Sequence, residues 1–229
     1  GPNYLRSGES YIVFGKTSEF AATIELSNLD GNNGFILKGV REYDASGYSV
    51  SGAGDFNGDG LDDVIIGARS AEPTSPDPYH YNYGASYIVF GKTSGFDALT
   101  HLSDLDGNNG FRLDGPVYSR SGSSVSRAGD INGIDSGSSY IVFGKDTDFD
   151  ATLDLTNLKG SDGFRVDGIA ERDGMRSSVS AAGDINGDGF DDVVISMPGA
   201  NLNGYDSGSA YILFGKVAGF TPVVDLLNL

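Results

Sequence analysis

The chain has 229 residues, and its 32 acidic and 15 basic side chains give a formal net charge of −17. This charge argues against nucleic acid or an anionic membrane surface as a partner, because both are negatively charged as well. The sequence has no cysteine, which excludes disulfides and thiol chemistry, and its 35 glycines favour a protein with many tight turns. No apolar run approaches the ~20 residues of a membrane-spanning helix, so we expect no insertion into a membrane.

A six-residue pattern of alternating aromatic and aliphatic residues marks four repeats. The sequence Tyr-Ile-Val-Phe-Gly-Lys begins at Tyr11, Tyr87 and Tyr140, and it returns with Leu for Val at Tyr211. We call this pattern the anchor. A common order of segments follows it: a stretch of the type Asp-Leu-Ser-Asn-Leu, a Gly-Phe segment, Ser-Val-Ser, an acidic loop, an apolar run and a link rich in Gly, Ser, Asn and Pro. Recurrence at this spacing indicates one supersecondary unit per repeat.

Each repeat contains four candidate strands. They are the anchor, the Gly-Phe segment that begins at Gly34, Gly110 or Gly163, the Ser-Val-Ser segment, and the apolar run after the acidic loop. Four antiparallel strands make one blade of a β-propeller, and no segment shows the sustained 3.6-residue period of a helix. We therefore predict an all-β fold of propeller blades in one domain, residues 1–229, with approximate repeat units at 11–86, 87–139, 140–210 and 211–229, the second shortened and the last partial.

The acidic loop carries the clearest chemical signal. It occurs in full at residues 55–63 and 184–192, with oxygen-bearing side chains at loop positions 1, 3, 5 and 9. Ca²⁺ takes six to eight hard oxygen ligands at about 2.3–2.6 Å, and the carbonyl at position 7 can add one. Three carboxylates this close repel one another unless a cation lies between them. The predicted Ca²⁺ ligands are Asp55, Asn57, Asp59, Leu61 and Asp63 in the first loop, and Asp184, Asn186, Asp188, Phe190 and Asp192 in the second.

The loop is not an EF-hand, because that motif needs a Glu at position 12 and a helix on each side. Position 12 is Ile66 or Ile195, and the residues that follow the loop are apolar and β-branched. The alternative interpretation is a hairpin turn of Asn, Asp and Gly that holds no ion. The recurrence of all four oxygen positions in both loops favours the ion.

In this order the segments resemble FG-GAP repeats, the blades of the integrin α-subunit N-terminal propeller and of many bacterial surface proteins. The most specific part is the acidic loop followed by Asp-Asp-Val-Ile-Ile-Gly-Ala at 62–68, although Ser46-Gly47 stands where the family has Phe-Gly. The resemblance extends from about Asn3 to Leu229 and favours the bacterial type. It implies loops that bind Ca²⁺ on one face of the propeller, in a secreted or cell-surface module for adhesion or for binding a protein or glycan.

A propeller-based hydrolase or lyase, or an accessory domain of an enzyme, is the alternative, because propellers also host enzymes. No Ser, His and Asp recur in a pattern that indicates a catalytic triad, so we expect no enzyme, no catalytic residue and no cofactor besides Ca²⁺. The tyrosine-rich link at 72–83 could bind a sugar or a protein, or it could pack its aromatic side chains on the blade.

The middle repeat is shortened within its acidic loop. Asp130-Ile-Asn-Gly133 begins a third loop, but Ile134-Asp-Ser follows at once, and the anchors on either side are 53 residues apart instead of 71. A deletion or missing residues between Gly133 and Ile134 would explain this spacing. With a continuous sequence, we expect no normal four-stranded blade here, and a slot filled by the anchor Tyr140–Phe143 moving inward or by another chain.

Counting strands from the first anchor gives two outer strands, one full blade, one reduced blade and one blade without its outer strand. Propellers have ~4–8 blades, so one chain cannot close a ring. We expect closure by self-association, with a dimer as the first choice because two copies would total seven blades as in integrins, or by further blades of a larger protein.

Overall fold

The computed structural model of the protein describes residues 7–72, 82–93, 95–127, 138–168, 178–201, 204–205, 207–217 and 219–226, and the backbone of 129–131. Within these ranges the chain consists of β-strands and three 3₁₀ turns, Leu26–Asn28, Leu102–Asp104 and Leu155–Asn157, and it has no α-helix. No helix in these ranges could cross a membrane. The predicted all-β class is confirmed.

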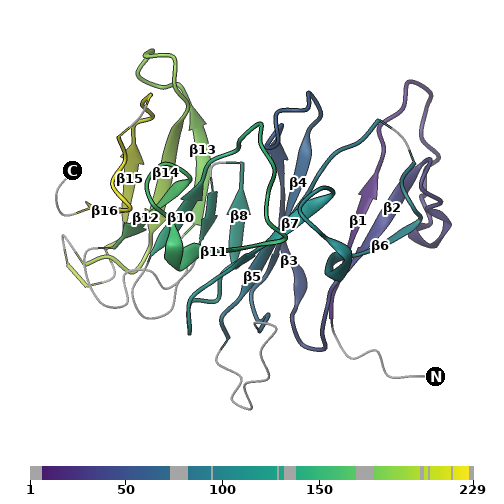
Figure 1. Cartoon of the computed structure of the whole chain (residues 1–229), viewed down its shortest axis with the longest axis horizontal. Helices are drawn as coiled ribbons and strands as arrows, with labels where there is room; N and C mark the ends of the chain where they lie inside the picture. Colours follow the sequence, from purple (N-terminus) through teal and green to yellow (C-terminus); the bar gives the residue numbers. More distant parts are fainter. Residues whose placement is uncertain are drawn as a thin grey trace.

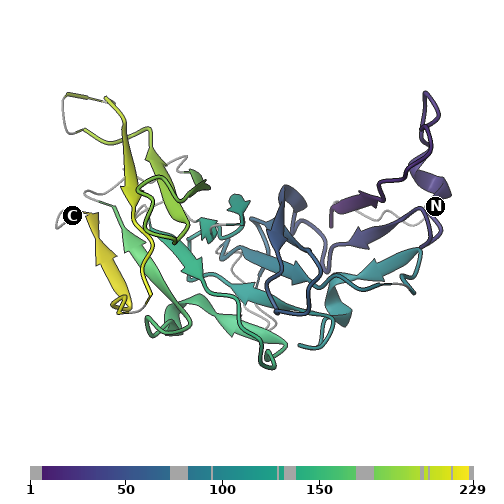
Figure 2. The same ribbon diagram turned by 90° about the horizontal axis from the view of Figure 1, so that it is seen from above.

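Four sheets follow one another along an open arc (Figures 1 and 2). The first sheet contains β1 (Glu9–Val13), β2 (Gly34–Lys38) and β6 (Leu99–His101). The second, in the order β11-β7-β5-β4-β3, contains β3 (Ser46–Gly54), β4 (Asp63–Ala68), β5 (Ala85–Val89), β7 (Gly110–Asp114) and β11 (Thr152–Asp154). The third, in the order β16-β12-β10-β9-β8, contains β8 (Ser124–Ser126), β9 (Gly129–Ile131), β10 (Ser139–Val142), β12 (Gly163–Asp167) and β16 (Val223–Asp225). The fourth contains β13 (Ser178–Gly183), β14 (Asp192–Met197) and β15 (Ser209–Leu213).

The four predicted strand types form the body of a complete blade. Ser-Val-Ser lies in the inner strand, the apolar run pairs with it, and the anchor comes next, as in β3-β4-β5. Each Gly-Phe strand then pairs antiparallel with its anchor, so that Phe111 lies opposite Ile88 and Phe164 opposite Ile141. The second sheet (blade two) carries all four strand types, whereas the third sheet (blade three) has β9 in the place of the apolar run. The first sheet has only the outer strands, and the fourth lacks a Gly-Phe strand among the described residues.

The hydrophobic cores lie between successive sheets, not within one sheet. Ile66 of β4 is fully buried in a cluster with Phe35 and Leu37 of the first sheet, whereas its neighbour Ile65 faces the third sheet in a cluster with Val125. A third cluster joins the third and fourth sheets. Because both faces of a central blade are covered, its strands are apolar at consecutive positions, as in the post-loop run.

After the second, third and fourth anchors, a fifth strand leaves its own blade and joins the preceding one. β6 pairs in parallel with β2, β11 with β7 and β16 with β12. We call the segment from the anchor lysine through this short strand the latch. The sequence pattern predicts only four strands per repeat, because three residues are too few to show an alternating pattern.

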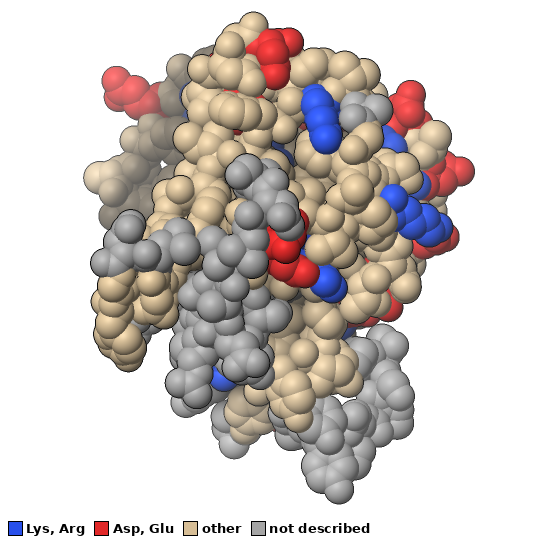
Figure 3. Space-filling view, turned by 90° about the vertical axis from the view of Figure 1, so that its left-hand side faces the viewer, with Lys and Arg blue, Asp and Glu red and all other residues tan. Residues whose placement is uncertain are grey.

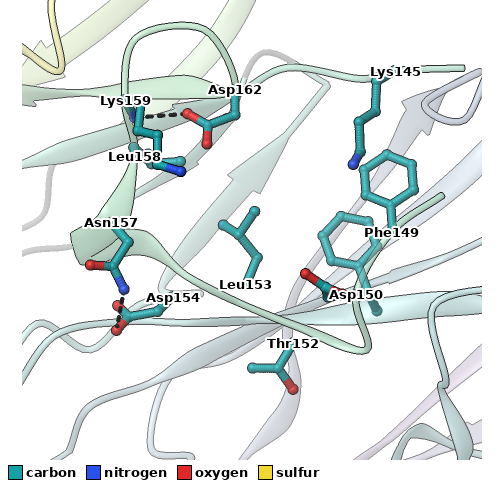
Figure 4. Close-up of a pocket in the computed structure, with 11 residues that line it drawn as sticks. Lys145, Phe149, Asp150, Thr152, Leu153, Asp154, Asn157, Leu158, Lys159 and Asp162 are labelled. Atoms are coloured by element: carbon teal, nitrogen blue, oxygen red, sulfur yellow. Dashed lines mark hydrogen bonds between the residues drawn. The ribbon is translucent and has the colours of Figure 1, made fainter. Parts of the chain in front are cut away.

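Each latch is fixed by a phenylalanine that stacks on the Gly-Phe strand of the preceding blade. The stacked pairs are Phe96 on Phe35, Phe149 on Phe111 and Phe220 on Phe164, with ring centroids 4.5, 4.6 and 4.3 Å apart. The anchor lysine four residues earlier places Nζ over the same ring, 4.6 Å from its centroid for Lys145 and Phe149 (Figure 4). Stacking thus joins successive blades, and the cation–π contact holds the phenylalanine within its own latch.

The slot in the middle repeat is filled by neither predicted candidate. β9, the first residues of the shortened acidic loop, pairs with β8 on one side and with β10 on the other. The anchor strand β10 keeps its normal partner β12. The expectation that the anchor moves inward, or that another chain enters, is therefore wrong. The residues that directly follow β8 satisfy its free edge through a tight hairpin, without breaking an existing strand pair. Residues 132–137, including Gly133 and Ile134, lie outside the described ranges.

Candidate metal centre

The two complete acidic loops occupy the same place in their blades. The first acidic loop (55–63) connects β3 to β4, and the second (184–192) connects β13 to β14, at equivalent ends of the two sheets (Figure 1). In the first loop Gly58 and Gly60 have φ angles of +75° and +88°, a left-handed conformation that glycine adopts without the strain of a side chain. The Asn-Gly-Asp-Gly sequence therefore fits this tight path.

Backbone N–H groups hold the oxygens of the first three predicted ligands. In the first loop the Asp55 carboxylate accepts from the N–H of Asp59 and Gly60, each at 2.9 Å. Asn57 Oδ1 accepts from the Asp59 N–H at 3.1 Å, and Asn57 Nδ2 donates to Asp59 Oδ2 at 2.9 Å. The structure thus brings Asp55, Asn57 and Asp59 into one hydrogen-bonded group. Asp59 Oδ1 in turn accepts from the N–H of Leu61, the position-7 residue, at 2.8 Å.

The second loop repeats this arrangement. Asp184 accepts from the N–H of Asp188 at 3.0 Å and of Gly189 at 2.9 Å, and Asn186 Nδ2 donates to Asp188 Oδ2 at 2.8 Å. Asp188 Oδ1 accepts from the Phe190 N–H at 2.9 Å. The two loops therefore have the same hydrogen-bonded backbone conformation. Their sequences show the recurring residues but not these hydrogen bonds.

The position-9 aspartates have a structural role that the sequence does not reveal. Asp63 is 2% exposed, and its two oxygens accept from the N–H of Phe56 at 2.8 Å and of Gly91 at 2.7 Å. Asp192 makes the same contacts with Ile185 and Gly215. Burial raises the pKa of the Asp63 carboxyl, although these N–H donors favour its charged form. Each of the two aspartates ties the start of its loop to the glycine of the following anchor.

The donors of both loops fit Ca²⁺ in their chemistry. All are carboxylate, amide or carbonyl oxygens, the ligands that this ion prefers. Each carboxylate has about four lone-pair sites, so the backbone contacts leave some free. Among the described residues, no three side chains of His, Cys, Asp or Glu form a group that could hold a metal by themselves. The predicted set also depends on the amide of Asn57 or Asn186 and on a carbonyl, and it stays a prediction.

The first loop differs from the second in its neighbours. Phe56 packs against Phe111 and Phe149, with ring centroids 5.9 and 5.7 Å away, and its carbonyl accepts from the Lys145 N–H at 3.0 Å. Ile185, at the same position of the second loop, is 53% exposed. The first loop is therefore packed against the latch of the following repeat, whereas no described latch covers the second loop.

A cavity of about 400 Å³ remains between the two loops. Asp55 and Phe56 line it from one side and Asp191 and Asp192 from the other, with Arg127 of the shortened hairpin between them. A smaller pocket of about 230 Å³ under the second latch offers no comparable grouping (Figure 4). Its Asp154 is engaged by Thr156 and Asn157 of its own turn.

The opposite end of blade two contains a buried ionic network. Arg112 is 8% exposed, contacts Asp114, and donates to the Tyr87 hydroxyl at 3.2 Å and to the Glu72 carbonyl at 2.9 Å. Burial raises the pKa of Tyr87 to about 12, so this phenol stays neutral. The hydrogen bond from Arg112 to Glu72 joins the start of the link after β4 to the outer strand β7. Residues 73–81 of the tyrosine-rich link lie outside the described ranges.

Two comparisons with known proteins agree with this architecture. The family model of the FG-GAP repeat matches residues 46–89 and 175–213, the stretches that contain the two complete acidic loops. Integrin alpha ina-1 of Caenorhabditis elegans is 30% identical over 186 residues, which cover 73% of this chain and 16% of that protein. The chain thus corresponds to about a sixth of this relative's length. Its repeats, its blades and these two matches together show that the chain contains FG-GAP repeats in an integrin α-like domain.

Proposed function

We propose that the chain is a Ca²⁺-binding interaction module of a secreted or cell-surface protein, which acts in adhesion by binding a protein or glycan ligand. The FG-GAP match and the similarity to an integrin α subunit support this class. No feature of the described residues favours the hydrolase or lyase alternative, so we propose no enzymatic activity. The propeller ring would be completed by self-association or by further blades.

The observation that carries the Ca²⁺ proposal is the equivalence of the two loops. Their oxygen side chains occupy the same positions and are oriented by the same backbone N–H groups. Bound Ca²⁺ would neutralise the repulsion between three carboxylates in each loop. Bound to its proposed ligands, the ion would hold the loop that connects the two inner strands of the blade in one conformation. A partner would then meet a rigid surface.

Thermal unfolding with and without a chelator tests this proposal. If the ion binds only the folded chain, a free concentration 100 times its Kd adds about 2.7 kcal/mol per site. We expect excess chelator to lower Tm, and the double variant Asp59→Ala, Asp188→Ala to lose that response. The exposed neighbours Asp62 and Asp191 are not proposed ligands, so Asp62→Ala with Asp191→Ala should keep it. An unchanged Tm in excess chelator would overturn the Ca²⁺ proposal.

A further inference from the structure

We propose that the cavity between the two acidic loops binds a small zwitterion, an α-amino acid with an apolar side chain. Its carboxylate would accept from the N–H of Gly144 and from the guanidinium of Arg127, and its ammonium group would pair with Asp191. These three residues all line the cavity of about 400 Å³, a size within the range of small-molecule sites. The adhesion function proposed above does not depend on this cavity.

The cavity lies beside the end of the third anchor strand, where the shortened repeat lacks its apolar run. In blade two, β4 pairs with β5 along its whole length, up to Val64 opposite Val89. In blade three, β9 pairs only with the first two residues of β10. Residues 142–144 therefore have no described strand on their inner edge, and they line the cavity instead.

The N–H of Gly144 lacks the acceptor that the glycines of the second and fourth anchors have. In the two complete repeats, the N–H groups of Gly91 and Gly215 donate to the position-9 aspartates at 2.7 and 2.9 Å. The shortened repeat has no aspartate at position 9, and within the described part of the chain the Gly144 N–H has no hydrogen-bond partner. The complete repeats thus show which group satisfies this donor, and that group is a carboxylate.

Arg127 brings a positive charge to the same cavity. The position directly after Ser-Val-Ser holds Gly52 and Ala181 in the complete repeats. The Arg127 side chain lies over Gly54, with Nε 2.9 Å from the point where a Cβ of that glycine would be. In the ranges that the structure describes, its guanidinium makes no hydrogen bond and no ion pair. It is therefore available for a carboxylate, which a guanidinium binds through two parallel N–H donors.

Arg127 and Gly144 contact the same short segment of the first loop. Arg127 lies on Gly54, and the carbonyl oxygen of Phe56 lies 2.5 Å from the Cβ position of Gly144. Gly54 and Phe56 are two residues apart, a span of about 7 Å at most. Because the arginine side chain is long and rotatable, one carboxylate can accept from its guanidinium and from the Gly144 N–H together.

The charges around the cavity favour a ligand that also carries a positive group. Asp55, Asp191 and Asp192 line the cavity, and acidic side chains stand at this end of the molecule in the view of Figure 3. Asp55 and Asp192 already accept backbone N–H groups. Asp191 is exposed, and its carboxylate has no hydrogen-bond or ion-pair partner among the described residues. An ammonium group beside Asp191 and a carboxylate beside Arg127 would match both charges of the site.

The remaining wall of the cavity favours an apolar side chain on the ligand. It consists of Ala53, Ile141, Val142, Phe143 and Val193. An amino acid whose charged ends face the two loops would place its side chain against this wall. Since burying apolar area is favourable, leucine should bind more tightly than glycine.

Titration of the full chain with L-leucine tests the proposal, by isothermal titration calorimetry in excess Ca²⁺. We expect saturable binding to one site. Three matched probes each remove one feature: leucine amide has no carboxylate, N-acetyl-leucine has no ammonium group, and glycine has no apolar side chain. Each should bind at least about tenfold more weakly than leucine, because a charged hydrogen bond or a buried side chain is lost.

Two variants assign the charged ends of the ligand. Arg127→Ala should weaken leucine binding about tenfold and leave the weak binding of leucine amide unchanged, because the amide has no carboxylate to lose. Asp191→Asn should weaken the binding of leucine and leave that of N-acetyl-leucine unchanged. Asp62→Asn is the matched control, since Asp62 holds the same loop position as Asp191 and is not among the described residues that line the cavity.

Several outcomes would overturn the proposal. They are the absence of saturable binding at millimolar leucine, equal binding of leucine and its amide or N-acetyl form, and leucine binding that survives Arg127→Ala. Tighter binding of glycyl-leucine than of leucine would also overturn it, since the occupant would then be the end of a peptide. The Arg127→Ala chain should still show a lower Tm in excess chelator, so the Ca²⁺ proposal and this one can fail separately.

Discussion

The latch contact leads to a sharp comparison: Phe149→Ala should lower stability much more than Phe20→Ala. Both phenylalanines lie under an anchor lysine, with Nζ 4.6 and 4.9 Å from the ring centroid. Phe149 also stacks on the fully buried Phe111 of the preceding blade, at an interplanar angle of 9°, whereas Phe20 is 50% exposed. Comparing the two variants therefore separates the stacking between blades from the cation–π contact with the anchor lysine.

The expected difference follows from burial and stacking. Removing a fully buried phenylalanine costs about 3–5 kcal/mol, and an aromatic pair adds about 0.5–1.5 kcal/mol beyond its buried area. Because Phe149 is partly buried, we expect a loss of about 2–3 kcal/mol. Phe20→Ala loses chiefly an exposed cation–π contact, which contributes about 0.5 kcal/mol. At about 2–4 °C per kcal/mol for a chain of this length, Phe149→Ala should lower Tm by roughly 5–10 °C and Phe20→Ala by about 2 °C or less.

The assay is thermal unfolding followed by circular dichroism, with excess chelator in every sample so that bound ions do not differ between variants. Far-ultraviolet spectra at 20 °C would first verify that both variants keep their β structure. Similar Tm shifts for the two variants would refute the role given to stacking between blades.

Two further predictions concern the first loop and the buried network. In urea unfolding, Phe56→Ala should lower the free energy of unfolding by about 1–2 kcal/mol and Ile185→Ala by less than about 0.5 kcal/mol. The reason is that only Phe56 packs on the neighbouring aromatic cluster. Equal losses for the two variants would contradict that packing. Burial raises the pKa of the Asp44 carboxyl, although the N–H of Arg41 and the charge of Arg112 act in the opposite direction. The charged form of Asp44 is therefore less stable in the folded chain than in the unfolded chain. The free energy of unfolding of the wild type, relative to that of Asp44→Asn, should therefore rise as pH falls through the pKa of Asp44 in the folded chain. The rise should be complete below the pKa in the unfolded chain, about 3.9. A difference that is constant from pH 7 to pH 3.5 would argue against this burial effect.

The strands that the sequence predicts correctly are those long enough to show a pattern. The anchors, the Gly-Phe segments and the post-loop runs form strands of four to six residues with apolar positions that face a neighbouring sheet, and recurrence reinforces each one. The latch strands of three residues carry no such pattern, because their stability comes from the preceding blade. The signal that could have revealed them is the spacing of lysine and phenylalanine, Lys16 to Phe20 and three later copies, which recurs in every repeat.

The candidate site shows a different limit. Spacing alone identifies the oxygen side chains of each acidic loop, but it cannot tell which of them also supports the fold. Asp63 satisfies the pattern of a ligand and, at the same time, ties its loop to the next anchor through Gly91. A carboxylate serves both purposes with the same atoms, so the sequence pattern is identical for either role.

The shortened middle repeat shows what holds the blades together. Each blade contacts its neighbours through the faces of its strands and through the latch, and both contacts survive beside the shortened repeat. Val125 of the third sheet still packs with Ile65 of the second, and β11 still pairs with β7. The acidic loops lie at the ends of the strands, so shortening one removes a predicted Ca²⁺ site without removing a blade. Arg127 lines the cavity together with residues of the two remaining loops. A partner that approached this face would therefore meet two acidic loops separated by a basic side chain, rather than three acidic loops in a row.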